Sequence, residues 1–388
     1  MPRLEGELKV GVSVYTSSFC HSILRIEPYT ACYFNCLYCY ARWYRGKGGI
    51  KAKKWLLKPL GKLWSRMASL GLRTIPFRIS TLADPLQPLE AEEKLTLRTL
   101  EMALRFEVPV VLNTKSTLFL RGPWKNILEE MASEGLILLQ ISLSSIREAS
   151  GEIEPRAPPG RERLEAISCL SDLVPCVLRL QPLVPGLFEE EEEELLTAIS
   201  SSGVKHVIVE FLRETPEGLD SLYARLGLDL KPDLWESYSP SGGRLLRPRS
   251  DYRRAVLARL RRRLKAEGIS LATCKEGLYG FHDGRDCCGF RFLRWDKVAY
   301  RLTLYEFWAR DWDVERTLRE IGSEEELLFG SRLAGYPNPV RKILRAHENK
   351  LLKVLGEPQV LAFLCPPGRD GILKPYTGSS PDLGGRGP

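Results

Sequence analysis

The chain has 388 residues, 44% of them hydrophobic and 27% charged, and its 57 Lys and Arg against 49 Asp and Glu give a net charge of +8. This length suits one large domain with an extension, or two domains, and the composition is typical of a soluble globular protein. Because no apolar run approaches the ~20 residues of a membrane span and the N-terminus lacks a signal peptide's apolar stretch, we exclude membrane-spanning, disordered, collagen-like and small disulfide-bonded proteins and expect a cytoplasmic chain.

Short apolar runs alternate with helical patterns through the first two thirds of the chain. Runs typical of strands buried on both faces of a parallel sheet are Ser22–Glu27, Pro76–Leu82, Val108–Thr114, Leu136–Ser144, Val174–Leu183 and Lys205–Leu212. Helices are predicted between them at Leu89–Phe106, Trp124–Ala132, Gly160–Leu173 and Glu189–Ser201. Six βα repeats with short links predict an α/β fold, a partial (βα)6 barrel resembling a TIM barrel with its helices outside.

The pattern changes towards the C-terminus. A helix at Asp251–Glu267 and a further strand at Ile269–Thr273 continue the alternation. Beyond them we expect helices at Val298–Ala309, Asp313–Ile321 and Pro339–Leu355. The predicted organisation is therefore a barrel over residues 1–275, a mostly helical, cysteine-containing extension over 276–365, and a disordered Gly-, Pro- and Ser-rich tail over 366–388.

Three cysteines lie within eight residues after the first predicted strand, in Cys32-Tyr-Phe-Asn-Cys36-Leu-Tyr-Cys39. A loop that leaves the C-terminal end of a barrel strand is where such folds place active sites. A [4Fe–4S] cluster usually takes four thiolates, so three leave one iron open for a small molecule. The alternative is a zinc site completed by His21 or Cys20.

This spacing resembles that of the radical S-adenosylmethionine (radical SAM) superfamily. Further segments resemble its spore photoproduct lyase-like branch, and the resemblance spans about residues 22–212. They are Cys39-Tyr-Ala, Ser80-Thr-Leu-Ala-Asp84-Pro, Thr114-Lys115-Ser116, Ile141-Ser142-Leu143-Ser144, Glu154-Pro-Arg-Ala-Pro158 and Pro182-Leu-Val-Pro-Gly186. The resemblance implies a radical SAM barrel, a [4Fe–4S] cluster, S-adenosylmethionine, and an electron donor such as ferredoxin or flavodoxin.

The resemblance also implies which residues meet the cofactor. Tyr38 would lie near the adenine ring, Asp84 near the methionine amino group and Lys115 near the carboxylate. Ser142 would face the ribose or the carboxylate. Arg179 lies among apolar residues of a buried strand and needs an anionic partner, which is either the cofactor carboxylate or Glu210. Structural alternatives are loop packing for Tyr38, a helix cap for Asp84 and a core hydroxyl for Ser142.

The sequence departs from the branch at one position. Spore photoproduct lyase places a hydrogen-donating cysteine just ahead of the aspartate motif, whereas this chain has Ser80-Thr-Leu-Ala83 there, without a thiol. The resemblance therefore implies an architecture and a cofactor, but it does not imply the same substrate.

A second group of cysteines, Cys274, Cys287 and Cys288, lies in a Gly-rich segment after the last predicted strand. It is a possible second metal site, such as an auxiliary iron–sulfur cluster. A zinc site, a thiol for hydrogen transfer, a disulfide and buried thiols are the alternatives. Adjacent cysteines rarely bind one small ion together, which weakens the zinc interpretation.

Two basic runs, Arg244–Lys265 and Lys47–Lys62, suggest contact with nucleic acid, or else solvated helix faces in a chain of thermophile-like composition. We thus predict an enzyme that reductively cleaves S-adenosylmethionine to a 5′-deoxyadenosyl radical, which abstracts hydrogen from a substrate such as a nucleic-acid base. Alternatives are a metal-containing nucleic-acid-binding protein without turnover, and a radical enzyme acting on a peptide or small metabolite.

Overall fold

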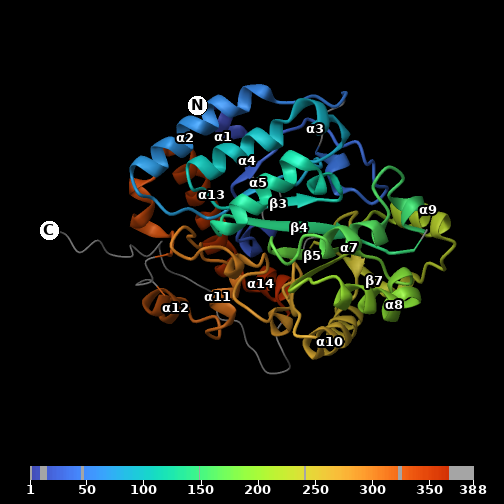
Figure 1. Ribbon diagram of the computed structural model, residues 1–388. Helices are drawn as coiled ribbons and strands as arrows, with labels where there is room; N and C mark the ends of the chain where they lie inside the picture. The colour runs from blue at the N-terminus through green and yellow to red at the C-terminus, as the bar shows by residue number, and fades with distance from the viewer. Residues whose placement is uncertain are drawn as a thin grey trace.

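A seven-stranded parallel sheet forms the centre of the computed structural model, which describes residues 2–8, 15–44, 48–147, 149–239, 242–321 and 326–366 (Figure 1). Its strands follow the chain in the order β1-β2-β3-β4-β5-β6-β9, and each pairs in parallel with its neighbours. They are β1 (Arg25–Ile26), β2 (Phe77–Ile79), β3 (Val110–Thr114), β4 (Ile137–Leu143), β5 (Cys176–Leu183), β6 (His206–Phe211) and β9 (Ser270–Thr273). The predicted α/β barrel of parallel strands, including the further strand, is confirmed.

Helices connect the consecutive strands. They are α2 (Leu57–Ser69), α3 (Pro88–Glu93), α4 (Leu95–Arg105), α5 (Gly122–Ser133), α6 (Ala149–Ile153), α7 (Gly160–Ser168), α8 (Leu187–Ser201), α9 (Pro216–Leu226) and α10 (Ser250–Ala266). The single helix expected over Leu89–Phe106 is wrong, because Lys94 has a φ of 49° and separates α3 from α4. A left-handed residue interrupts the helical hydrogen-bond series, so the chain turns there.

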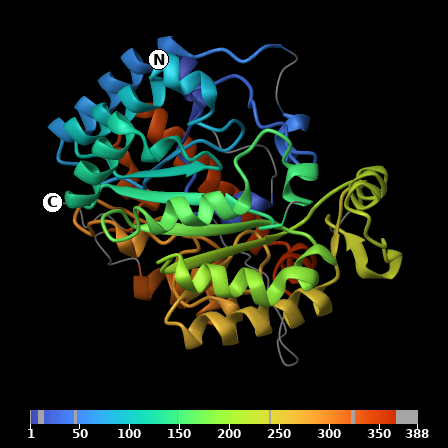
Figure 2. The same cartoon turned by 45° about the vertical axis from the view of Figure 1, so that its right-hand side comes forward.

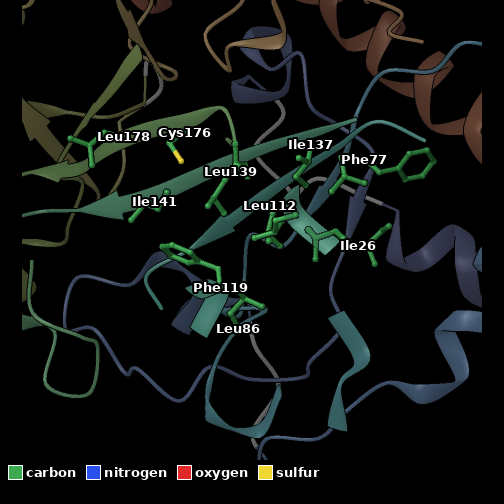
Figure 3. Packing of buried hydrophobic residues seen from close by; sticks show 14 of the residues in the cluster. Ile26, Phe77, Leu86, Leu112, Phe119, Ile137, Leu139, Ile141, Cys176 and Leu178 are labelled. Atoms are coloured by element: carbon green, nitrogen blue, oxygen red, sulfur yellow. The ribbon is translucent and has the colours of Figure 1, made fainter. Parts of the chain in front are cut away.

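The two faces of each strand have different surroundings because successive side chains point to opposite sides. On β4, Ile137, Leu139 and Ile141 join the cluster formed with the outer helices (Figure 3). Leu138, by contrast, belongs to a separate cluster on the inner face. The strands are therefore buried on both sides, as their unbroken apolar runs predict.

The C-terminal region contains the helices α11 (Leu304–Trp308), α12 (Val314–Ile321), α13 (Asn338–Leu355) and α14 (Pro358–Leu364). The helix expected over Val298–Ala309 is wrong in its first half, since only α11 forms. The short N-terminal helix α1 (Pro2–Glu7) contacts α13. Buried Leu328 and Val340 join the same cluster as the barrel helices, so the boundary at residue 275 stays a prediction. The predicted tail lies outside the described residues, apart from Pro366.

A segment of this C-terminal region covers the inner face of the sheet. Cys287, Cys288, Phe290 and Leu293 form one buried cluster with inward side chains of the sheet, which are Val111, Leu138, Val177, Ile208 and Ala272. The inner face is thus filled by side chains at this level, and the strand ends that carry the cysteine loop lie beyond it.

An antiparallel hairpin of β7 (Trp235–Ser237) and β8 (Leu246–Pro248) follows α9. The hairpin and α9 project together on the right of Figure 2. The basic residues of α10 face the glutamate run of α8: Arg259 lies 3.0 Å from Glu192, and Arg263 lies 3.4 Å from Glu193. These ion pairs favour the interpretation of a solvated helix face. Across the described ranges, no helix combines the length and the apolar character needed to cross a bilayer.

Candidate functional site

The cysteine loop begins directly after β1. Asn35, between Cys32 and Cys36, has a φ of 52°, a left-handed conformation that asparagine adopts more readily than most residues. The backbone amide of Cys39 donates to the carbonyl of Cys36 at 3.2 Å. This tight turn places all three predicted cluster ligands, each only partly buried, on one short loop beyond the C-terminal end of a strand.

The three thiols lie close enough to interact electrostatically. Burial raises the pKa of Cys32 to about 11, and the negative charges of Asp84 and Cys39 contribute to the shift. Burial likewise raises the pKa of Cys36, followed by the charge of Glu154. Burial therefore favours the protonated thiols of Cys32 and Cys36, and a metal would displace those protons.

The two residues that could complete a zinc site at this loop, Cys20 and His21, have their contacts with the second cysteine group. Cys20 interacts electrostatically with Cys274 and Cys288 of the second cysteine group, and His21 packs against Phe290 of the same region. Among the described residues, no three His, Cys, Asp or Glu side chains are arranged as a site for a metal ion. Cluster binding by the loop therefore stays a prediction.

Glu27, at the end of β1, holds the neighbouring loop in place. Its carboxylate accepts hydrogen bonds from the backbone amides of Thr81 at 2.7 Å, Leu82 at 2.9 Å and Ala83 at 3.3 Å. This loop also carries Asp84. A carboxylate accepting several backbone N–H groups is a strong, charge-assisted arrangement, so the first two strand ends are joined.

Asp84 lies against both the cysteine loop and the end of β3. Its backbone amide points at Cys32 Sγ, 3.4 Å away. Its carboxylate accepts hydrogen bonds from Thr114 Oγ1 at 2.7 Å, from the Lys115 amide at 2.6 Å and from the Leu86 amide at 2.9 Å. Burial raises its pKa, although the three hydrogen bonds act in the opposite direction. A carboxylate has about four acceptor positions, so one is left for a further donor.

Glu154 is the centre of a buried polar group that the sequence reasoning missed. Lys115 Nζ lies 2.8 Å from its Oε1, Ser144 Oγ lies 2.9 Å from the same atom, and the side chains of Tyr38 and Arg163 also bond to it. Burial alone would raise its pKa, but the charges of Arg163 and Lys115 outweigh burial and hold the pKa of Glu154 at about 2. Glu154 is thus an anion that positions a cation and a phenol beside the cysteine loop.

Ser142 and Arg179 lie on the inner face, directly opposite each other on β4 and β5. The guanidinium of Arg179 donates to Gln140 Oε1 at 2.7 Å and to Gln181 Oε1 at 2.6 Å. The expectation that Glu210 could be its partner is wrong, because Glu210 pairs with Arg213 and with Lys275 instead. Of the five predicted cofactor residues, Tyr38, Asp84 and Lys115 gather beside the cysteine loop. Arg179 lies with the second cysteine group.

The second cysteine group lies on the inner face. Cys274 follows β9, and the sulfurs of Cys287 and Cys288 are 3.8 Å apart. All ten cysteines are among the described residues, and all are free of disulfide bonds. The disulfide alternative is therefore wrong for this structure. No sequence signal joined Cys20 to this group, because its position beside Ser22 and Cys288 depends on the folded chain.

No protein-family model and no curated protein sequence matches the chain. Solved structures of spore photoproduct lyase do match. A cysteine-to-serine mutant aligns with a TM-score of 0.53 at 15% identity, covering 68% of this chain and 80% of that protein. The lyase complexed with dinucleoside spore photoproduct aligns with a TM-score of 0.52 at 16% identity over 69% and 79%. A double mutant with bound AdoMet and the same dinucleoside gives 0.52 at 16%, over 66% and 79%.

These likenesses agree with the architecture described above. The chain shares the fold of spore photoproduct lyase, and it has a central sheet of seven parallel strands, flanking helices and a mostly helical C-terminal region.

Proposed function

We propose that the chain is a radical SAM enzyme whose [4Fe–4S] cluster is held by Cys32, Cys36 and Cys39. The observation that carries this proposal is the position of three partly exposed thiols on one loop at the C-terminal end of a parallel barrel strand. Three ligands leave one iron open, which suits a cofactor bound through nitrogen and oxygen. When bound, the cluster and S-adenosylmethionine supply reductive cleavage to a 5′-deoxyadenosyl radical that abstracts hydrogen.

The residues around the loop have roles that follow from their contacts. Asp84 keeps one acceptor position beside Cys32, where it can receive the cofactor's amino group. Lys115 supplies positive charge near a bound carboxylate while Glu154 holds its ammonium in place. Tyr38 is 8% exposed and its hydroxyl donates to Glu154, which holds the ring beside the cysteine loop, where it can flank the adenine of the cofactor.

A nucleic-acid base is the substrate class that the surface favours. Four exposed aromatic side chains follow or belong to the cysteine loop: Tyr33, Tyr40, Trp43 and Tyr44. Cations lie over three of these rings, with Arg156 over Tyr33, Arg42 over Trp43 and Lys275 over Tyr40. Exposed rings interleaved with cations are the means by which proteins stack and hold single-stranded nucleic acid. A solved spore photoproduct lyase also carries a dinucleoside.

Anaerobic reconstitution tests the reaction. Protein loaded with iron and sulfide, reduced with dithionite or flavodoxin and given S-adenosylmethionine, is expected to release 5′-deoxyadenosine. A Cys36→Ala variant should lose that release, whereas Cys169→Ala, which removes an exposed thiol outside the site, should keep it. Absence of cleavage by the iron-loaded protein, or full activity of Cys36→Ala, would contradict the proposal.

The substrate class needs a separate measurement. Release of 5′-deoxyadenosine should rise with single-stranded DNA or RNA oligonucleotides and should not rise with peptides or extracted metabolites. A Trp43→Ala variant should weaken the response to oligonucleotides while slow cleavage without substrate continues. Stimulation by peptides alone, or oligonucleotide binding with no cleavage under any condition, would overturn the nucleic-acid substrate.

A further inference from the structure

Four cysteines from three separate chain segments lie near one another. Cys274, Cys287 and Cys288 belong to the inner-face cluster. Cys20 Sγ donates to the carbonyl of Ser22 at 3.2 Å, and the hydroxyl of Ser22 in turn donates to Cys288 Sγ. Cys20 ends the short helical turn Thr16–Phe19, Cys274 continues β9, and Cys287 and Cys288 belong to the covering segment. Side-chain interactions join Cys274 to Cys287 and Cys287 to Cys288. Buried cysteines usually lie singly among apolar side chains, so a convergence of four thiols suggests a shared ligand.

Two arginines point at these sulfurs. Arg78 Nη2 lies 3.1 Å from Cys288 Sγ, and Arg179 Nη2 lies 3.7 Å from Cys274 Sγ. The hydroxyl of Ser22 also donates to Cys288 Sγ, at 3.6 Å. The thiols are thus surrounded by N–H and O–H donors, which is the outer shell that stabilises sulfur bound to iron.

The charges of the two arginines are not balanced by acids. Both residues are more than nine tenths buried. Neither guanidinium forms a salt bridge with any carboxylate in the described parts of the chain, and Arg78 Nε has no hydrogen-bond partner there. Arginine keeps its proton in proteins, and a buried charge without a counter-charge is costly. Thiolates of the cysteine group, with an anionic iron–sulfur core between them, would supply negative charge beside both guanidiniums.

We infer that Cys20, Cys274, Cys287 and Cys288 hold a second iron–sulfur cluster. A single zinc ion would need all four sulfurs at about 2.3 Å from one point, and adjacent cysteines such as Cys287 and Cys288 rarely bind one small ion together. A cluster presents several irons, so the adjacent Cys287 and Cys288 can bind different ones. Cys287 also lines a small cavity together with His21, Lys275, His282 and Tyr305.

The inference is independent of S-adenosylmethionine cleavage and is tested without it. In a Cys32→Ala/Cys36→Ala/Cys39→Ala variant the loop cannot bind iron, so any iron and sulfide kept after anaerobic reconstitution belong elsewhere. We expect about four irons and four sulfides per chain, with the brown colour of a cluster. Adding Cys274→Ser and Cys288→Ser should abolish both. Adding Cys176→Ser, a matched buried thiol outside the group, should change neither.

A second variant keeps all four thiols and so avoids the risk of misfolding. Arg78→Gln removes one positive charge and one N–H donor from Cys288, and should lower the reduction potential of the retained cluster without changing its iron content. The inference would be overturned if the triple variant bound no iron or bound zinc instead. It would also be overturned if iron remained after the Cys274→Ser and Cys288→Ser changes, or if Arg78→Gln left the reduction potential unchanged.

Discussion

Replacement of Glu154 by Gln tests whether the buried anion holds the loop region together. The carboxylate is 1% exposed and pairs with Arg163, which is also 1% exposed, and with Lys115 at 14%. Removing one member of a buried ion pair leaves an uncompensated charge and costs about 3–5 kcal/mol. The pKa leads to a similar figure: a decrease from 4.5 to about 2 corresponds to about 3 kcal/mol at neutral pH.

The sign of the pH dependence follows from the direction of that shift. The folded-state pKa of Glu154 is depressed, so its contribution is complete above pH 4.5 and is lost as the pH falls towards 2. Urea unfolding followed by tryptophan fluorescence, at pH 7 and at steps below pH 5, measures both effects. Glu154→Gln should unfold at lower urea than the parent at pH 7, and the two should converge at low pH.

The matched control is Glu152→Gln, two residues earlier. Glu152 pairs with Arg225 at 3.6 Å, and both side chains are more than half exposed, so its loss should cost less than about 1 kcal/mol. If Glu154→Gln destabilised the protein no more than Glu152→Gln, or if it and the parent lost stability in parallel between pH 5 and 2, the reasoning would be refuted.

Two further predictions concern stability away from the site. Burial first, then Arg301, lowers the pKa of His347 to about 3, so unfolding should become easier by about 1.4 kcal/mol per pH unit as the pH falls from 6.5 to 3. His347→Gln should flatten that slope in urea titrations, and an unchanged slope would count against the assignment. Leu139→Ala on β4 removes a fully buried side chain and should cost about 2–5 kcal/mol, whereas Leu173→Ala, at 61% exposed, should cost little. Equal urea midpoints for the two alanine variants would contradict the packing described for the sheet.

The strands were predictable because their information is local. Runs such as Leu136–Ser144 are apolar on both faces, and only a parallel sheet covered on both sides buries both faces. The cysteine loop was predictable for the same reason, since its three cysteines lie within eight residues. The break in the helix predicted over Leu89–Phe106 was not predictable, because the left-handed conformation of Lys94 does not alter the apolar pattern.

The contacts of the site could not be read from the sequence. Glu154 stands in a motif whose spacing says nothing about Lys115 or Tyr38, which come from other strand ends. Glu27 accepts hydrogen bonds from the Thr81–Ala83 loop, more than fifty residues away in the sequence. The sequence left two anionic partners open for Arg179, and one of them, Glu210, is not its partner in the structure. Its contact with Gln140 on the neighbouring strand depends on register, which a sequence pattern does not specify. Joining Cys20 to the second cysteine group likewise requires the folded chain.

The covering of the inner sheet face by Phe290 and Leu293 limits how a substrate can approach. With the inner face filled at this level, a substrate of the proposed enzyme would approach from the strand ends that carry the cysteine loop. A long polymer would lie across these strand ends and offer one unit at a time, and it would not have to thread through the protein. Selection of a substrate would then depend on how readily one unit leaves its chain, more than on the size of the molecule that carries it.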